Sequence, residues 1–570
     1  MNRFLFPVIF ILKIFFSHTL LADDHGITFR TYFSDETAAG MQVFGHDIPV
    51  TGRVFVIISR DSLVEPRLRV HVTGPQIFGK NIKDVYPDQR VMFQDDDPDI
   101  IGYPHRRFSD IEPGYYYVQT FLTVYTTFER ADGHVVNLFL DTGAGGPQGM
   151  FISPGNIHSG VQRIYIDPAG YAEFEIELGN VIEPLQPLRE GKVQQQGNPA
   201  DTDWVKYIKI KSDLLSEFWG RPMYIGANIL LPKGYYDNPE TEYPVVFHMG
   251  HFPGERAPFG FREGVEGSGR TKGLYEFWNS DDAPRFIAVS IRNANPYYGT
   301  SYSVNSANVG PYGDVLTEEL IPYLEENFRM IGEPWARMLA GGSTGGWEAL
   351  ALQVWYPEYF GGTWSWCPDA VDFNHYQVVN IYRDDNAYYN TRNWIKTERP
   401  SSRNLDGNIS YTVRQEMYWE QALGTNSRSG KQWSIWEAVY SPVGPDGYPM
   451  PIWDPVTGKI DRVVAAYWRE RYDIHHYLRN NWERIGKDLR GKIHIATGDM
   501  DNYYLELAVY RLEAFLREVD NPPAEAVIQY GRMKPHCWIG ESPFRPGEDL
   551  IFTGFFQLVA DYMMERKIKE

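Results

Sequence analysis

Cysteine is scarce in this sequence, which limits how the fold can be held together. Only two cysteines occur, Cys367 and Cys537, so at most one disulfide can form and a small disulfide-stapled scaffold is excluded. The chain also has no CxxC or HExxH motif. His248 and His251 have a spacing that metal ligands can share, but no further ligand cluster accompanies them, and we predict neither a metal nor another cofactor.

Positive charge is also in short supply. Lysine and arginine number 54 against 74 aspartates and glutamates, which gives a formal net charge of -20. Such a chain would be repelled by a nucleic-acid backbone or an anionic membrane surface, so neither is expected as the main partner. Hydrophobic residues make up 43% and aromatic residues 15%, enough for large cores and for aromatic binding surfaces.

Long apolar runs are absent beyond the N-terminus. The stretch from Phe4 to Phe16, broken by Lys13, is shorter than the roughly 20 residues of a spanning helix. It is followed by a short segment that ends at Ala22, the layout of a secretory signal. We therefore predict a signal peptide at 1–22, a secreted or periplasmic location, and no stable membrane insertion after cleavage.

Residues 23–183 have the alternation of β-strands. Runs such as Gly52–Ser59, Arg67–Val72 and Tyr115–Phe128 are separated by turn signals, with one apolar face and one wetter face. Several such strands with no helical period between them predict an all-β, immunoglobulin-like sandwich domain. The polar stretch 184–203 is predicted to be a linker.

From 204 to 570 strands alternate with helical segments, which predicts a mostly parallel sheet with helices on both faces. A long insertion at about 373–490 is rich in Trp, Tyr, Asn and Arg. It includes a predicted helix at Val463–Trp482. We expect the insertion to form a cap over the active-site face, because such excursions usually carry function.

The segment Gly341-Gly342-Ser343-Thr344-Gly345 follows an apolar run and precedes strong helix formers. Glycines on both sides of a serine allow the sharp strand-to-helix turn of a nucleophile elbow, which leaves the serine exposed. By itself the pattern is weak, and a glycine-rich packing turn is the alternative. The strand before it and the helix after it favour Ser343 as a nucleophile.

A serine nucleophile needs a base, and the base needs an orienting carboxylate. In the α/β-hydrolase fold the acid follows a late strand and the histidine follows the last one. Asp501 and Asp499 both follow the strand that ends near Thr497, and we choose Asp501 as the acid. His536 follows the final strand and is the predicted base.

The oxyanion of an acyl-transfer intermediate needs two donors. One is predicted to be the backbone N–H of Thr344, just after the nucleophile, and the other that of His251, in the loop after the third strand. Cys537 adjoins His536, and Cys367 ends the strand after the nucleophile helix. These two cysteines are therefore candidates for a disulfide beside the site, with two unpaired thiols as the alternative.

Several segments together resemble the esterase D family of α/β hydrolases. They are Tyr243-Pro-Val-Val, the helix from Glu319 to Phe328, Gly342-Ser-Thr-Gly-Gly, Tyr356-Pro-Glu-Tyr-Phe-Gly, Gly498-Asp-Met-Asp and His536-Cys-Trp. The family includes S-formylglutathione hydrolases, feruloyl and acetyl-xylan esterases, enterochelin esterases and mycolyltransferases. The resemblance implies Ser343 as nucleophile, His536 as base and Asp501 as acid, since the acid of that family lies three residues after the glycine.

This sequence departs from the family in two places. Many members have His-Gly at the oxyanion strand, where this chain has Met249-Gly250, and its cap is larger than usual. The prediction is an exported serine esterase acting on a small-molecule or glycan ester, such as a feruloyl-type or siderophore ester. Acyl transfer or peptidase chemistry on the same triad, and a non-catalytic binding protein, are the alternatives. The sequence does not determine the oligomeric state.

Overall fold

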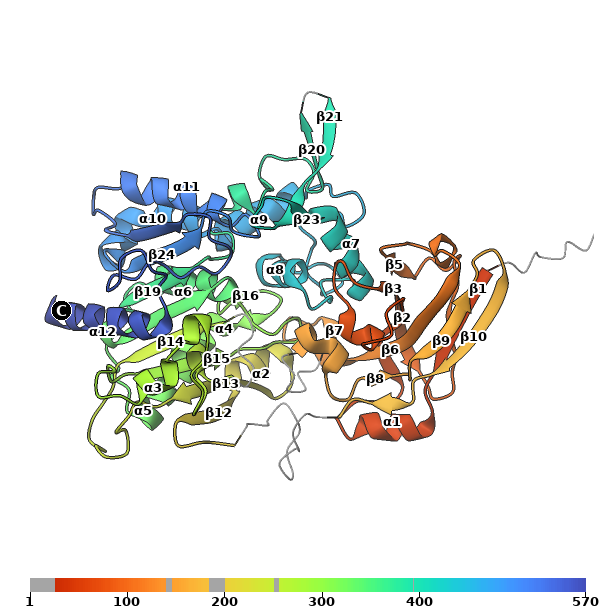
Figure 1. The fold of residues 1–570 in the computed structure, drawn as a ribbon, viewed down its shortest axis with the longest axis horizontal. Coiled ribbons are helices and arrows are strands. Elements are labelled where there is room, and N and C mark those ends of the chain that lie inside the picture. The colour runs from red at the N-terminus through yellow and green to blue at the C-terminus, as the bar shows by residue number, and fades with distance from the viewer. Residues whose placement is uncertain (1–25, 140–145, 184–199, 251–255, 393, 570) are drawn as a thin grey trace, which may run out of the picture.

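The computed structural model describes residues 26–139, 146–183, 200–250, 256–392 and 394–569. They form an N-terminal part of β-sheets beside a larger sheet flanked by helices (Figure 1). The N-terminal part is not all-β as predicted, because Ser34 caps a short helix, α1 (Asp35–Gln42), by accepting from the Thr37 N–H. The predicted signal peptide at 1–22 and most of the predicted linker at 184–203 lie outside the described residues. The domain boundaries at 23–183 and 204–570 stay predictions. Among the described helices, none has the length and apolar character needed to cross a membrane.

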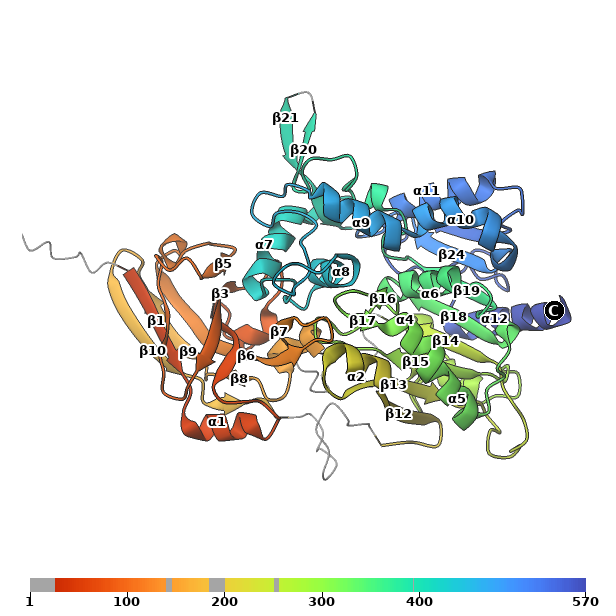
Figure 2. The same ribbon diagram turned by 180° about the vertical axis from the view of Figure 1, so that it is seen from behind.

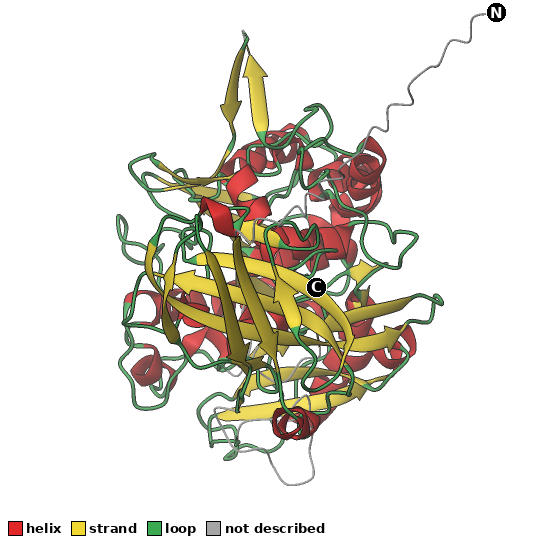
Figure 3. Ribbon diagram, turned by 90° about the vertical axis from the view of Figure 1, so that its right-hand side faces the viewer, coloured by secondary structure: helices red, strands yellow, loops and turns green. Residues whose placement is uncertain are grey.

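Two β-sheets form the N-terminal part, and Figure 3 views the molecule from that end. β1 (Gly26–Tyr32) lies between β10 (Tyr171–Glu177) and β4 (Val91–Phe93). The larger sheet has the order β11 (Asn180–Val181), β8 (Ile157–His158), β6 (Gly114–Glu129), β2 (Val50–Ser59), β3 (Gln76–Val85) and β5 (Ile101–Tyr103), with β7 (Val135–Phe139) and β9 (Gln162–Ile166) also paired to β6. Side chains of both sheets share one apolar core. The immunoglobulin-like character of this part stays a prediction.

The strand β2 buries both of its faces. Val54 and Val56 point into the core between the two sheets, whereas Phe55 packs with Trp419 of helix α7 (Val413–Leu423). Because side chains alternate along a strand, one strand can serve two cores. Figures 1 and 2 both show α7 lying between the N-terminal strands and the rest of the molecule. The insertion that carries α7 is thus packed on the N-terminal part.

Arg53 of β2 holds the end of α7. Its side chain is entirely buried, and its guanidinium donates to the carbonyl of Ala422 at 3.1 and 3.0 Å and to that of Gln421 at 3.2 Å. These carbonyls lie at the helix C-terminus, where acceptors lack helical partners and the dipole is negative. Gly79 of β3 allows this approach, because a Cβ there would lie 2.2 Å from the Ala422 oxygen.

Replacing Arg53 with methionine is expected to lower the free energy of unfolding by about 2 to 4 kcal/mol, because buried carbonyls lose their donors. Burial lowers the pKa of Arg53 to about 10, so the lost group is charged at neutral pH. Urea unfolding followed by tryptophan fluorescence measures the change. Arg90→Met is the control, since Arg90 makes an exposed pair with Glu175 and should matter little. Equal stability of Arg53→Met and the wild type would contradict this role.

The second part is built on an eight-stranded sheet. Its order is β12 (Val205–Ser212), β13 (Met223–Leu230), β15 (Ile287–Arg292), β14 (Val245–Met249), β18 (Arg337–Gly342), β19 (Gly362–Trp366), β24 (Ile493–Gly498) and β25 (Val527–Gly531). From β15 to β25 the neighbours are parallel, and β13 is antiparallel to both of its neighbours. This arrangement is that of an α/β hydrolase, as predicted.

Helices cover both faces of this sheet. One face packs against α3 (Leu274–Trp278) and α12 (Phe552–Lys569). The other packs against α5 (Ile321–Phe328), α6 (Thr344–Trp355), α10 (Ile474–Leu489) and α11 (Glu506–Glu518). Because the strands from β15 to β25 are parallel, their carboxyl ends meet at one edge of the sheet. Sheets of this kind carry their ligand-binding or active site at that edge.

The insertion between β19 and β24 is a layer of its own. It contains β20 (Tyr389–Arg392), β21 (Ile395–Glu398), β22 (Pro400–Arg403), β23 (Ile409–Thr412), α7, α8 (Gln432–Tyr440) and α9 (Arg462–Tyr472). The β20–β21 hairpin projects away from the body in Figures 1, 2 and 3. The single helix predicted at Val463–Trp482 is two helices, because Asp473 is extended and its side chain caps α10 by accepting from the His476 N–H.

Candidate active site

Ser343 lies in a sharp turn between β18 and α6. Its backbone has φ 60° and ψ -125°, a conformation that residues other than glycine rarely adopt. The turn depends on its glycines. A Cβ on Gly341 would lie 2.3 Å from the Gly345 oxygen, and one on Gly345 would lie 2.3 Å from the Met249 oxygen. Helix and strands therefore approach as a nucleophile elbow requires, with the serine at the carboxyl edge of the sheet.

His536 lies between Ser343 and Asp501. Its Nε2 is 2.9 Å from the Ser343 Oγ, and its Nδ1 is 2.6 Å from the Asp501 Oδ2. The three residues come from the ends of three different strands, β18, β24 and β25. The structure thus brings the predicted nucleophile, base and acid together, within the range that proton transfer needs.

The loops after β24 and β25 are packed closely on each other. A Cβ on Gly498 would lie 2.1 Å from the Lys534 oxygen, and the backbone N–H of His536 donates to the Asn502 Oδ1 at 3.0 Å. The competing carboxylate, Asp499, accepts from the backbone N–H of Met533 at 2.6 Å instead. Asp499 therefore supports the histidine loop, whereas the Asp501 carboxylate faces the imidazole.

The electrostatics of the site favour a protonated His536. Burial alone would lower the pKa of His536, but the negative charge of Asp501 and the neighbouring Cys537 outweigh it and hold the pKa well above its usual value. Asp501 is fully buried, so little water screens this interaction. Such a pair stabilises the imidazolium that forms when a base takes up the serine proton.

Arg403, at the end of β22 in the insertion, holds the loop that carries Asp501. Its Nε donates to the Asp501 carbonyl at 2.9 Å, and its guanidinium pairs with Glu506 at 2.7 Å. Its backbone N–H and carbonyl bond to the backbone oxygen and side-chain amide of Asn502, each at 2.8 Å. The insertion therefore supports the loop that carries Asp501, and its role as a cover of the active site stays a prediction.

Sequence reasoning missed two residues of this site. Arg403 could not be identified from the sequence, because its partner Asp501 lies nearly 100 residues away along the chain. One arginine in an insertion rich in arginines is also not distinctive. Asp369 lies next to Ser343 and belongs to the Cys367-Pro-Asp369 segment just after β19. A carboxylate that directly follows a parallel strand beside the nucleophile strand is a signal that could have found it.

Of the two predicted oxyanion donors, Thr344 lies among the described residues and His251 does not. Thr344 is the first residue of α6 and is buried beside Ser343. His251 lies outside the described residues, as does the rest of 251–255, so its role stays a prediction.

His248, at the end of β14, has its ring stacked on Phe259 and accepts from that residue's N–H. Burial lowers the pKa of His248 to about 3, as expected of a neutral core histidine.

Cys367 and Cys537 converge beside the site. Their Sγ atoms lie 3.0 Å apart as free thiols, farther than the roughly 2.05 Å of a disulfide bond. The disulfide itself stays a prediction. With His536 they form a group whose ligand atoms lie within 4.8 Å of one another. Both ring nitrogens of His536 are already hydrogen-bonded to Ser343 and Asp501, so the arrangement serves proton transfer better than metal binding.

Residues 220–441 match a family model described as "Putative esterase", a segment that includes Ser343. No curated protein matches the chain. Solved structures similar to it include a ferulic acid esterase, with 14% identity, TM-score 0.36, and coverage of 64% of this chain and 99% of that one. An S-formylglutathione hydrolase from Agrobacterium tumefaciens has 12% identity and TM-score 0.32, with 64% and 96% covered. A ferulic acid esterase from Anaeromyces mucronatus has 15% identity and TM-score 0.29, with 64% and 93% covered.

Proposed function

We propose that the esterase-family domain of this chain is a carboxylic ester hydrolase that works through a covalent acyl-enzyme on Ser343. The observation that carries this proposal is the position of His536, whose two nitrogens lie 2.9 Å from the Ser343 Oγ and 2.6 Å from the Asp501 Oδ2. The family match over residues 220–441 gives the reaction class, ester hydrolysis. The geometry supports a part in it for each of the three side chains.

In this mechanism the His536 Nε2 takes the proton of the Ser343 hydroxyl while Oγ bonds to the ester carbonyl carbon. Asp501 holds the Nδ1–H and stabilises the imidazolium. The imidazolium then returns its proton to the departing alcohol, and the acyl group stays on Ser343. A water, deprotonated by the same nitrogen, releases the acid and restores the serine. The backbone N–H of Thr344 and a second donor, proposed as that of His251, would stabilise the oxyanion.

Labelling with a fluorophosphonate probe tests the nucleophile. Wild-type protein should become covalently labelled, and mass spectrometry of the digest should place the adduct on Ser343, because such probes phosphonylate an activated serine. Ser343→Ala should give no labelling. Ser365→Ala is the matched control, since the Ser365 hydroxyl donates to the Gly346 carbonyl away from His536. Labelling that persists in Ser343→Ala, or is missing from folded wild-type protein, would rule the proposal out.

The activity should rise with pH over a range set by His536. The base must be neutral to accept the serine proton. Burial lowers the pKa of His536, but the negative charge of Asp501 outweighs burial, so the pKa is raised overall. Protonated, inactive enzyme therefore persists to higher pH than with an ordinary histidine. We expect kcat/KM for a neutral ester, measured from about pH 5 to pH 10, to increase with an apparent pKa above about 6.5. A midpoint below that value would contradict the assigned electrostatics.

The location and substrate class are also part of the proposal. The predicted signal at 1–22 supports a secreted or periplasmic enzyme. There an oxidising environment would favour the bond between Cys367 and Cys537. The ester is proposed to be a small molecule or a glycan-linked ester, and the large cap would shape the groups that are accepted.

A further inference from the structure

A second carboxylate, Asp369, lies beside the nucleophile. Its Oδ1 is 3.4 Å from the Ser343 Oγ, and its backbone N–H donates to the Ser343 carbonyl at 3.3 Å. The residue is only 4% exposed. It follows β19, and the two ring nitrogens of His536 bond to Ser343 and Asp501 rather than to it, so its position needs another explanation.

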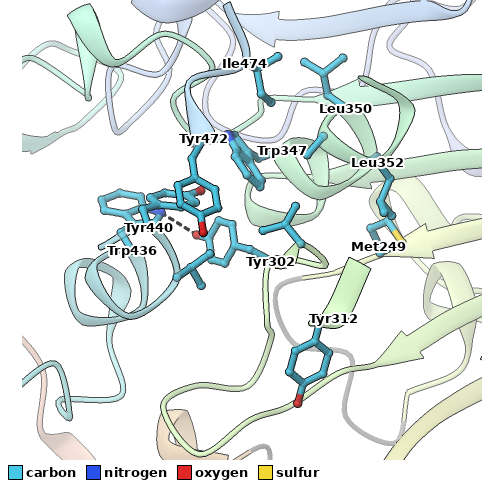
Figure 4. Close-up of a cluster of buried hydrophobic side chains, with 14 of the residues drawn as sticks. Met249, Tyr302, Tyr312, Trp347, Leu350, Leu352, Trp436, Tyr440, Tyr472 and Ile474 are labelled. Atoms are coloured by element: carbon cyan, nitrogen blue, oxygen red, sulfur yellow. Dashed lines mark hydrogen bonds between the residues drawn. The ribbon is translucent and has the colours of Figure 1, made fainter. Parts of the chain in front are cut away.

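The other oxygen of Asp369 is held by donors from three separate segments. Oδ2 accepts from the Tyr302 hydroxyl at 2.6 Å, from the Thr344 hydroxyl at 3.0 Å and from the Gln432 amide at 3.2 Å. Trp436 of α8 donates in turn to the Tyr302 hydroxyl at 2.7 Å, as the dashed line in Figure 4 shows. The loop after β15, the elbow and the cap thus fix this carboxylate, and its Oδ1 is the oxygen that faces Ser343.

No lysine or arginine in the described part of the chain forms an ion pair with Asp369, and the cation that acts on it is protonated His536. Burial raises the pKa of Asp369, and the Tyr302 hydrogen bond and the His536 charge offset this only in part. A buried carboxylate with no lysine or arginine partner is costly, and negative charge grows beside it when Ser343 attacks. A donor carried by the substrate would relieve both effects.

We propose that Asp369 binds a hydrogen-bond donor, a hydroxyl or an ammonium group, on the carbon next to the scissile carbonyl of the ester. This inference rests on the proposed function and specifies its substrate as a 2-hydroxyacyl or 2-aminoacyl ester. In the acyl-enzyme such a group is three bonds from the Ser343 Oγ. With bonds of about 1.5 Å it can fold back to roughly 3 Å from Oγ, and the Asp369 Oδ1 lies 3.4 Å from the same atom.

Three ethyl esters of the same carbon skeleton test this subsite: propionate, lactate and alaninate, which carry hydrogen, hydroxyl and ammonium at the same carbon. We expect Asp369→Asn to lower kcat/KM for lactate or for alaninate by about 10- to 100-fold more than for propionate, the worth of a hydrogen bond to a charged group. A selective loss for lactate identifies the hydroxyl as the ligand, and one for alaninate identifies the ammonium. Rates are corrected for uncatalysed hydrolysis at each pH.

Glu348→Gln is the matched control, because it removes another fully buried carboxylate. Glu348 accepts from Thr300 and, at 3.4 Å, from Asn293, and has no contact with Ser343. Its replacement should change the three esters by the same factor. The wild type supplies a measurement that needs no variant: it should prefer lactate or alaninate over propionate by more than their ratio in alkaline hydrolysis.

Equal losses for all three esters in Asp369→Asn, or no preference in the wild type, would overturn the subsite. If the wild type hydrolyses none of the three but fluorophosphonate still labels Ser343, the serine-hydrolase proposal stands and the Asp369 assignment falls. If the protein is neither active nor labelled, both fall together.

Discussion

Alanine in place of His536 should lower kcat for an ester by about 10⁵- to 10⁶-fold, the largest effect expected of any change outside Ser343. The imidazole Nε2 lies 2.9 Å from the Ser343 Oγ, closer than the Asp369 Oδ1 at 3.4 Å, and it can accept the hydroxyl proton and later return it to the alcohol. Without it the hydroxyl stays protonated and the leaving group departs unassisted. Steady-state hydrolysis of a p-nitrophenyl ester, with the uncatalysed rate subtracted, measures the loss.

His476→Ala is a suitable control for this experiment. His476 is on α10, and its ring contacts Glu470 and Asn480 at the surface. Its loss should leave kcat within about threefold, as for an ordinary surface change. A His536→Ala protein that is folded and keeps more than about a thousandth of the wild-type kcat would show that another base acts, because removing the base of such a triad costs far more.

Asp501→Asn should lower kcat by about 10⁴-fold. The amide keeps the shape of the side chain but removes the charge, and its nitrogen would present a donor to the His536 Nδ1, which favours the wrong tautomer. The same change should move the midpoint of the pH profile downward, because the Asp501 charge is what raises the pKa of His536 against burial. Both effects are measured in one series of kcat values against pH.

Asp499→Asn provides the contrast, two residues away in the same loop. Its carboxylate accepts from the Met533 N–H and does not contact His536, so kcat should fall by less than about tenfold. A larger loss with Asp499→Asn than with Asp501→Asn would reverse the assignment of the acid.

The α/β sheet could be predicted from the sequence because local signals agreed with the tertiary fold. The apolar run before Gly341 and the helix formers after Ser343 identified the elbow, and chain order placed Asp501 and His536 at the same sheet edge. These residues lie at strand ends, and a regular sheet fixes where strand ends go. No comparable rule places long-range contacts made by irregular segments, such as the contact of Arg403 with the loop that carries Asp501, so these contacts could not be predicted from the sequence.

Two sequence-based predictions in the N-terminal part were wrong, because residues outside the alternating pattern determine the local structure. The run Arg67–Val72 was predicted as a strand, but Pro66 begins a 3₁₀ turn at Pro66–Arg69. In the run Tyr115–Phe128, which was predicted to have one wetter face, Gln119 and Thr123 are the polar residues expected on that face, yet both are buried in β6. Gln119 bonds to Glu65 and to the Ser159 carbonyl, and Thr123 receives a hydrogen bond from Asn156. Alternation identifies the two faces of a strand but not what covers each.

The cap is anchored on both sides, and this limits how the protein could be re-engineered. Arg53 holds the end of α7 from the N-terminal sheet, and Arg403 holds the Asp501 loop from the cap. A chimaera that received a shorter insertion from another hydrolase would lose the brace on its acid loop and expose the apolar face of β2. Altering substrate choice by transplanting the cap would therefore require the N-terminal sheet to be transplanted with it.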